Sequence, residues 1–283
     1  MRLRVVLATF LVLAAIVSVG IYLAVRGLSH GLPIKLAVQQ CVVTVDGGTA
    51  ILNPEQMANA ATISAVGIRR GVPTQAITVA LATALQESKL QNVSGGDRDS
   101  VGLFQQRPSQ GWGTAEQIAD PHYAARKFFE ALAKVKGWQQ MTVAAAAQAV
   151  QRSADGTAYA QWEDKAQMLA TALTGAATGA VGCTITDQPA ARGPAAATAL
   201  AGGVAADWGN VKTANDNSVV GLSLAVTEAK IGWQYAHWLV SHAADQNVQS
   251  VRFGDQQWTA KAGNWSKATG DPTGDKVIAA VYP

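Results

Sequence analysis

The chain has 283 residues, which is enough for one or two domains that each bury a hydrophobic core. Hydrophobic residues make up 49% of it and charged residues only 14%, which excludes a disordered chain and indicates an alanine-rich helical protein. The formal net charge of +3 suits a protein near an anionic wall or membrane surface, but no dense Lys/Arg cluster predicts nucleic-acid binding.

The first predicted element is a membrane-spanning helix. Residues 5–25 are apolar or small and carry no charge, a run long enough to cross a bilayer. Arg2 and Arg4 precede this run, so the positive-inside rule places the N-terminus in the cytoplasm. We predict a single-pass anchor at the cell membrane over residues 1–26, with the rest of the chain extracytoplasmic and facing the cell wall. A cleaved signal peptide is the alternative.

A series of helix signals follows a short connector over residues 26–40. Capping residues or prolines predict helix starts at Asn53-Pro54, Pro73-Thr74, Asp120-Pro121, Thr142 and Asp155. Residues 91–113 are rich in turn-forming residues and interrupt this pattern. Residues 41–175 therefore predict one all-helical domain with a single irregular segment.

The composition changes after residue 175. Residues 176–203 are rich in Ala and Gly and lack apolar periodicity, which predicts a linker. Residues 222–246 show helical periodicity, and short strand-like runs follow at 248–253, 257–260 and 277–282. This part of the chain predicts a small α+β module. Its histidines His237 and His242 are five residues apart on the predicted helix, a spacing that does not predict a metal site.

Cys41 and Cys183 flank the predicted helical domain. Two cysteines in an exported chain indicate a disulfide, although two unpaired thiols are the alternative. A bridge would close a loop of roughly 140 residues and stabilise the fold by up to roughly 5 kcal/mol. Histidines are absent from the neighbourhood of either cysteine, so we predict no metal site there.

Glu87 stands at the end of the second predicted helix, just before the irregular segment. A general acid in glycoside cleavage has to keep its proton near neutral pH, which apolar surroundings favour. In the following segment, Gly102 lets the backbone approach a sugar closely, and Phe104 and Gln105 offer a wall and a hydrogen bond. A glutamate at a helix end is more often simply solvated, so the hypothesis depends on this combination.

The order of these motifs resembles that in goose-type lysozymes and lytic transglycosylases, where a Glu-Ser at a helix end precedes Gly-Leu-Met-Gln. Here Glu87-Ser88 precedes Gly102-Leu103-Phe104-Gln105, and the loop from Gly96 through Ser100 to Gln105 is similar to the goose-type loop. Residues 149–153 and Tyr159 match a third family segment and a later tyrosine more weakly. The resemblance covers residues 50–175. It implies that Glu87 is the catalytic acid.

Further roles follow from the same resemblance. It implies that Ser88, Gly102 and Gln105 shape the sugar site. It also implies that Asp97 helps to position water. The second aspartate that follows Gly-Leu-Met-Gln in goose-type lysozymes is absent, and an asparagine of the third segment is replaced, with Gln151 as the nearest amide. A hydrolase needs a second carboxylate, whereas a lytic transglycosylase works with one. The single-carboxylate mechanism is therefore the prediction.

The segment after Phe104 contains side chains that suit sugar recognition. Arg107 is suited to pair with a carboxylate of the substrate, and Trp112 either stacks on a pyranose face or packs inward. The run Phe-Gln-Gln-Arg-Pro-Ser-Gln-Gly-Trp-Gly-Thr, together with the Gln-Glu-Ser sequence around Glu87, resembles a group of exported actinobacterial lysozyme-like proteins. In the C-terminal module, the tryptophans bind glycan or, more often at such spacing, belong to the core.

We therefore predict a mainly α protein with an anchor over 1–26, a lysozyme-like catalytic domain over 41–183, a linker over 184–215 and a small α+β module over 216–283. The expected activity is cleavage of the β-1,4 bond between N-acetylmuramic acid and N-acetylglucosamine in peptidoglycan glycan strands by a lytic transglycosylase. A hydrolytic goose-type muramidase and a non-catalytic wall-binding scaffold are the alternatives. No cofactor or metal is expected.

Overall fold

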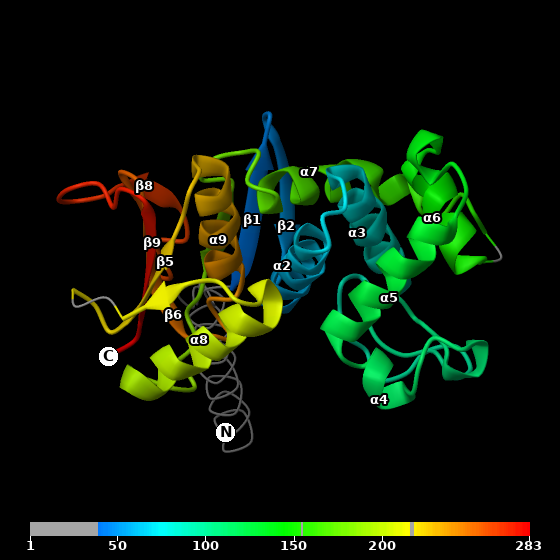
Figure 1. The fold of residues 1–283 in the computed structure, drawn as a ribbon, viewed down its shortest axis with the longest axis horizontal. Helices are drawn as coiled ribbons and strands as arrows, with labels where there is room; N and C mark the ends of the chain where they lie inside the picture. The colour runs from blue at the N-terminus through cyan, green and yellow to red at the C-terminus, as the bar shows by residue number, and fades with distance from the viewer. Residues whose placement is uncertain (1–38, 154, 216–217) are drawn as a thin grey trace, which may run out of the picture. The chain divides into compact units, whose positions relative to one another are not determined.

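The structure, a computed structural model, describes residues 39–153, 155–215 and 218–283 (Figure 1). Helices contain 44% of the residues and strands 18%, and the strands form two antiparallel sheets. The predicted mainly α class is therefore wrong, and the fold is α+β. The helices were expected, but the strands before residue 185 were not.

The helices of the N-terminal half begin largely where their capping residues predict. Asn53 forms a capping box: its Oδ1 accepts from the Gln56 N–H at 2.8 Å, and Gln56 Oε1 accepts from the Asn53 N–H at 2.9 Å. Asp155 instead accepts hydrogen bonds from Thr157 in a turn, so the fifth predicted helix begins later than expected. The helices up to residue 173 are α2 (Pro54–Arg69), α3 (Thr74–Ser88), α4 (Ala115–Ile118), α5 (Pro121–Lys134), α6 (Val143–Gln151) and α7 (Glu163–Leu173), with short 3-10 helices η1 (Pro108–Gln110), η2 (Trp138–Gln140) and η3 (Ala160–Trp162).

A three-stranded sheet closes the two ends of this helical part. It has the order β2-β1-β3, from β1 (Gln40–Val45), β2 (Gly48–Leu52) and β3 (Val181–Thr184). Asp46 and Gly47 connect β1 to β2 with φ angles of 49° and 79°, as a two-residue hairpin of the I′ kind requires. Cys41 and Cys183 are cross-strand partners and form a disulfide, which confirms the predicted bridge.

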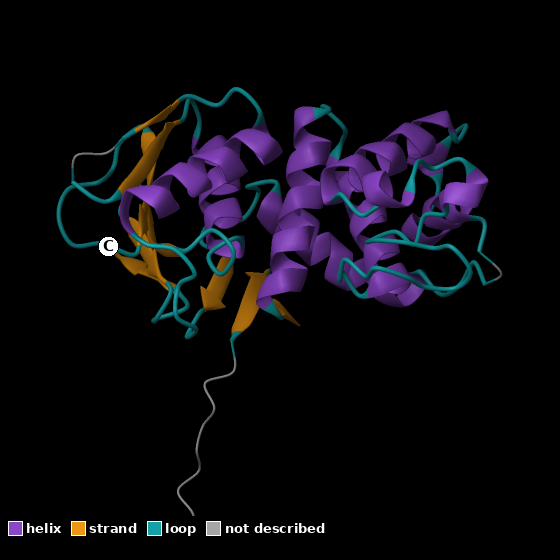
Figure 2. Cartoon of the chain, turned by 90° about the horizontal axis from the view of Figure 1, so that it is seen from below, coloured by secondary structure: helices purple, strands orange, loops and turns teal. Residues whose placement is uncertain are grey.

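The second sheet belongs to the C-terminal part and has the order β4-β5-β9-β6-β7-β8. Helices α8 and α9 pack against it (Figures 1 and 2). The segment 222–246, predicted as one helix, contains β5 before α9 begins. The elements are α8 (Gly193–Trp208), β4 (Thr213–Ala214), β5 (Gly221–Ala225), α9 (Ala229–Ser241), β6 (Val248–Phe253), β7 (Gln256–Thr259), β8 (Trp265–Lys267) and β9 (Lys276–Val281).

Helix α8 occupies much of the segment predicted as a linker. Its buried apolar residues Ala196, Leu200, Val204 and Trp208 are four residues apart, so they lie along one face. This spacing was not recognised in the sequence because the many Ala and Gly residues around it are typical of a linker. Residues 39–283 group into one compact unit, and how they divide into domains remains a prediction.

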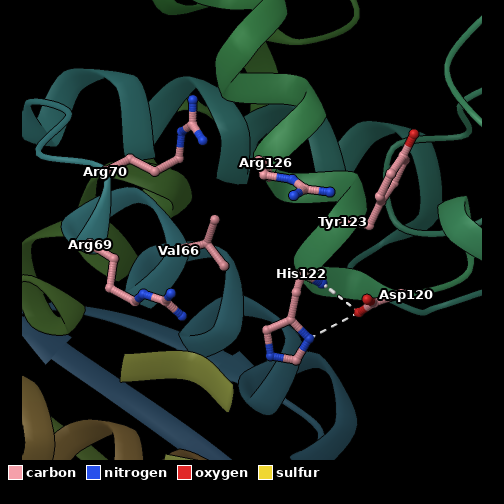
Figure 3. A pocket seen from close by; sticks show the side chains of 7 residues that line it. All are labelled: Val66, Arg69, Arg70, Asp120, His122, Tyr123 and Arg126. Carbon is pink, nitrogen blue, oxygen red and sulfur yellow. Dashed lines mark hydrogen bonds and ion pairs between the residues drawn. The ribbon is translucent and has the colours of Figure 1, made fainter. Parts of the chain in front are cut away.

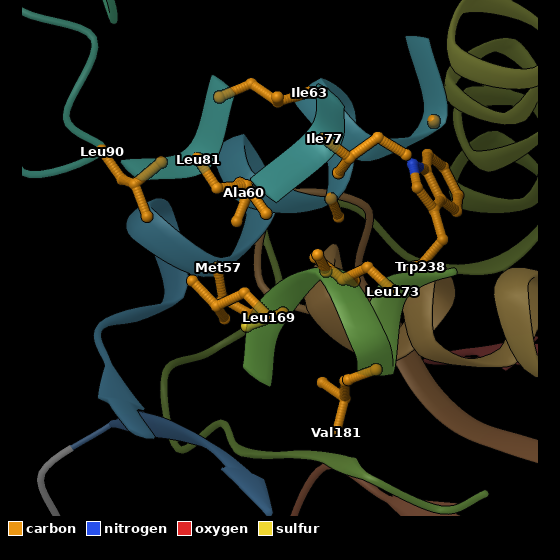
Figure 4. Packing of buried hydrophobic residues seen from close by; sticks show 14 of the residues in the cluster. Met57, Ala60, Ile63, Ile77, Leu81, Leu90, Leu169, Leu173, Val181 and Trp238 are labelled. Carbon is orange, nitrogen blue, oxygen red and sulfur yellow. The ribbon is translucent and has the colours of Figure 1, made fainter. Parts of the chain in front are cut away.

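Helix α2 lies at the centre of the packing and contacts α3, α5, α7, α8 and α9. Residues 60–67 of α2 and 76–85 of α3 are buried on all sides. Small residues permit this: a Cβ at Gly67 would lie 2.8 Å from Cγ1 of Ile77 and 3.0 Å from Cζ of Phe129. Figure 4 shows part of the resulting core, with Met57, Ala60, Ile63, Ile77, Leu81, Leu169 and Leu173.

The predicted single-pass membrane localisation is contradicted. Within 39–153, 155–215 and 218–283, no helix is both long and apolar enough to cross a membrane. The segment that led to that prediction, residues 1–26, lies outside the described residues.

Candidate functional site

Helix α3 places Glu87 and Ser88 in its last turn. The helix is buried along most of its length, whereas Glu87 is half-buried and Ser88 is buried. The chain then leaves the helix through two consecutive left-handed residues, Lys89 and Leu90, with φ angles of 58° and 62°. The Leu90 N–H donates to the carbonyl of Ala84 at 3.1 Å, which closes the helix end. Glu87 therefore lies on a rigid element that ends directly after it.

Tyr159 contacts the predicted catalytic acid from a distant part of the sequence. Its side chain is 1% exposed, and its Oη donates to Oε1 of Glu87 at 2.7 Å. Burial raises the pKa of the Tyr159 phenol, and the hydrogen bond to Glu87 raises it further. The phenol therefore remains a donor over the physiological pH range and holds one carboxyl oxygen of Glu87.

The segment that resembles Gly-Leu-Met-Gln forms a tight hairpin. Val101 and Gln106 exchange two backbone hydrogen bonds, of 2.9 and 3.1 Å. Gly102 has a φ of +76°, and a Cβ there would lie 2.7 Å from the backbone oxygen of Ile118. A glycine is required at this position, because a side chain would meet both left-handed strain and a backbone atom.

Side chains of the two other motifs hold this hairpin. Ser88 Oγ donates to the carbonyl of Leu103 at 2.8 Å, and Gln151 Nε2 donates to the carbonyl of Phe104 at 2.8 Å. Together with the bond between Tyr159 and Glu87, these contacts bring the three sequence motifs together. Ser88 and Gln151 thus act on the backbone of the hairpin in this structure.

Other predicted sugar-site residues have structural partners. Phe104 is fully buried and stacks on Phe128, with ring centroids 4.8 Å apart, so it belongs to the core. Gln105 has a φ of 47°, is half-buried, and donates through Nε2 to the carbonyl of Gly102 at 3.1 Å. Ser100 is buried below the hairpin. These residues shape the hairpin, and their direct contact with sugar remains a prediction.

Two charged residues predicted for the site are paired within the protein. Arg107 Nε lies 2.7 Å from Asp99 Oδ1. The backbone N–H of Ser109 and the Arg107 guanidinium hold the pKa of the Asp99 carboxyl well below its usual range. Asp97 lies in an exposed turn, where its contact is a loose ion pair with Arg98 at 3.9 Å. Glu87 is not among the contacts of Asp97.

Trp112 and Gln151 line one cleft, which has a volume of about 680 Å³. Trp112 is half-buried and packs partly on the core, so its indole is neither free nor fully enclosed. The cleft is also lined by the cations Lys127, Lys134 and Arg152 and by one acid, Glu130. Gln151 also holds the hairpin and so connects it to this cleft, whereas Glu87 is not among the residues that line the cleft.

A second polar cluster, which the sequence analysis missed, surrounds Asp207 in α8. The carboxylate is 2% exposed and accepts hydrogen bonds from His122 Nε2, from Trp238 Nε1 and from Thr62 Oγ1, the last at 3.0 Å. His242 Nε2 lies 3.5 Å from its Oδ2. We call these five residues the Asp207 cluster. Apart from Trp238 and His242, its members are far apart in sequence, and Asp207 falls in the predicted linker, so no local signal revealed the cluster.

The two histidines of the Asp207 cluster each lie between two carboxylates. His122 Nδ1 contacts Asp120 at 2.9 Å, and His242 Nδ1 contacts Asp245 at 2.9 Å. The hydrogen bond to Asp207 raises the pKa of His122. Burial lowers the pKa of His242, but the charge of Asp245 and the contact with Asp207 raise it more, to about 9. Burial raises the pKa of Asp207, but hydrogen bonds from both histidines bring it below its usual range.

His237 is buried apart from this cluster and serves the core. Its Nδ1 donates to the carbonyl of Ala172 at 2.8 Å, and its Nε2 accepts from the N–H of Ala180 at 3.0 Å. Burial lowers its pKa to about 4, so it is neutral near pH 7. Trp233, Trp238 and Trp258 are buried as well. Among the described residues, no group of three or more His, Cys, Asp or Glu side chains could hold a metal ion.

No protein-family model matches the chain, and its sequence matches none of the curated proteins. The likeness to goose-type lysozymes and lytic transglycosylases therefore rests on the motifs and remains a prediction.

Replacing Gly102 by alanine tests the close approach of the hairpin to Ile118. We expect Gly102→Ala to lower the free energy of unfolding by about 3 kcal/mol, because left-handed strain and a backbone clash add. Gly111→Ala is the matched control, since Gly111 has a φ of +80° but open space around its Cβ position. Urea unfolding of both variants is the measurement, and Gly111→Ala should lower the free energy of unfolding by only about 1 kcal/mol. Equal losses in the two variants would contradict the clash.

The Asp207 cluster predicts a loss of stability in alkaline solution. A histidine with a raised folded-state pKa stabilises the protein below its unfolded value of about 6.5, and that contribution disappears as the pH rises through the folded value. For His242 this value is about 9. We expect the free energy of unfolding to fall by about 3 kcal/mol from pH 6.5 to 9.5, with His122 acting in the same direction. His237 titrates below this window.

The measurement is urea unfolding at several pH values for the wild-type protein and for His242→Gln. The variant should show a clearly shallower decline across this range. The same slope in both proteins would show that His242 is not the titrating group.

Proposed function

We propose that this protein is a peptidoglycan glycosidase that cleaves the β-1,4 bond between N-acetylmuramic acid and N-acetylglucosamine. It acts as a lytic transglycosylase with Glu87 as its one catalytic carboxyl group. The observation that carries this proposal is the 2.7 Å hydrogen bond from Tyr159 to Glu87. It joins the Glu-Ser motif to the later tyrosine of the resemblance, 72 positions away in the sequence.

The geometry around Glu87 suits a group that gives and then takes a proton. Tyr159 occupies Oε1, and the Glu87 side chain makes no other hydrogen bond or ion pair within the described part of the chain. In the first step, the carboxylic acid of Glu87 protonates the glycosidic oxygen as the bond to C1 of muramic acid breaks. In the second, the carboxylate removes the proton from the C6 hydroxyl of the same sugar as O6 bonds to C1. The products are a free GlcNAc end and an anhydro sugar, and Glu87 is protonated again.

A single carboxyl group is the better proposal than a pair. Hydrolysis with inversion or retention requires a second carboxylate within roughly 5–10 Å of the first, on the other side of the sugar. Asp97 is the residue that the resemblance suggests, but it is exposed and its contact is Arg98. Intramolecular attack by the C6 hydroxyl needs no such residue.

The cleft lined by Trp112 and Gln151 supports a substrate with acidic groups. Its cations Lys127, Lys134 and Arg152 outnumber its one acid, Glu130. The peptide stems of peptidoglycan carry carboxylates, which such a surface attracts. The half-buried indole of Trp112 offers an apolar face for a sugar ring at the same place.

Product analysis tests this proposal. We expect the purified protein to release anhydro-muropeptides from peptidoglycan, and Glu87→Gln to reduce the rate at least 1,000-fold, because the variant has no proton to give. Glu228→Gln, which removes an exposed carboxylate at the start of α9, should retain full activity. Mass spectrometry of the products is the measurement. Reducing ends would indicate a muramidase, and binding without products would leave a non-catalytic wall-binding protein.

Tyr159→Phe tests the contact that carries the proposal. We expect a loss of about 10- to 100-fold in kcat with little change in KM, because the phenol positions Glu87 and leaves the bound sugar untouched. A variant with wild-type kcat, or one that loses activity only through a higher KM, would remove Tyr159 from the mechanism.

A further inference from the structure

A small cavity of about 300 Å³ lies between α2 and α5, apart from the residues around Glu87. Arg69 and Arg70 reach it from the end of α2, and Arg126 reaches it from α5 (Figure 3). His122 and Asp120 line its other side, at the start of α5. Three guanidinium groups therefore line one small cavity.

Two of the three guanidinium groups have no carboxylate partner among the described residues. Arg69 Nη1 donates to the backbone carbonyls of Ala206 at 2.8 Å and Asp207 at 3.1 Å, which hold the side chain without neutralising it. The Arg126 guanidinium lies 5.0 Å from the ring of Tyr123. These contacts orient both groups beside the cavity and leave their charges unpaired.

The remaining charges around the cavity are already paired with one another. Arg70 Nη1 lies 3.6 Å from Glu130. Asp120 accepts from Nδ1 and from the backbone N–H of His122, and the dashed lines in Figure 3 show both contacts. His122 Nε2 donates to Asp207 behind the cavity. The carboxylate of Asp120 is therefore not free to neutralise Arg69 or Arg126.

We propose that this cavity binds a phosphoryl group, as inorganic phosphate or as the phosphate end of a phosphorylated sugar. Two uncompensated guanidinium groups match the two negative charges of a phosphate monoester, and planar N–H donors suit its oxygen atoms. The volume is at the lower end for ligand sites, which fits a phosphate with few attached atoms. The proposal does not depend on the glycosidase activity, because it uses none of the residues around Glu87.

Titration of the full-length protein with inorganic phosphate, at constant ionic strength, tests the site. We expect saturable binding in calorimetry and a loss of at least tenfold in affinity for Arg126→Gln, whose contact with Tyr123 is made within α5. Arg69→Gln should weaken binding to a similar degree. Arg98→Gln, a change of the same kind in an exposed turn, should bind phosphate like the wild type.

Two further ligands define the chemistry. Acetate should bind at least tenfold more weakly than phosphate, because it carries one charge. Glucose 1-phosphate binding more tightly than phosphate would identify a phosphorylated sugar as the ligand, whereas equal affinities would identify the phosphate group alone. The proposal is overturned by absent saturation, by acetate binding as well as phosphate, or by Arg98→Gln weakening binding as much as Arg126→Gln. Arg126→Gln decides the matter even if Arg69→Gln fails to fold.

Discussion

The buried carboxylate of Asp207 imposes a condition that the surrounding helices have to meet together. A carboxylate away from water is costly unless donors and cations satisfy it. Thr62 in α2, His122 in α5 and Trp238 in α9 all reach this one group in α8. A shift of any of these helices would remove one of the partners of this charge. The condition therefore favours one arrangement of the helices that carry the candidate site and those that lie beside the larger sheet.

The effect of this condition extends to Glu87 through α2. The side chains of Gln56 and Asn59, near the start of α2, donate to the carbonyls of Lys89 and Leu90, each at 2.8 Å. Those two residues are the left-handed turn that directly follows the candidate site. Since Thr62 on the same helix contacts Asp207, one rigid element connects the buried charge to the end of α3. The position of Glu87 thus depends on packing well outside its own motif.

Local sequence signals predicted many of the helices. Features that depend on contacts between residues far apart in the sequence could not be predicted in this way. Capping residues such as Asn53 mark helix starts because they satisfy backbone groups a few residues away. The Asp46-Gly47 pair is an equally local signal for a hairpin. The helix signals that follow it led instead to the prediction of an all-helical domain. The motif order placed Glu87 with its hairpin, but whether Phe104 faces sugar or core depends on α5. The partners of Asp207 come from three other helices, which no periodicity reveals.

The disulfide has a mechanical consequence for the candidate site. Cys41 and Cys183 are paired across neighbouring strands, and everything between them is a covalently closed loop. A pulling force applied to the chain before Cys41 and after Cys183 passes through the sulfur atoms and bypasses the polypeptide between them. Glu87 and its hairpin lie inside that loop. Tension along the chain would therefore load the disulfide and the strands β1 and β3 that carry it. The segment that contains Glu87 and its hairpin would bear none of that load.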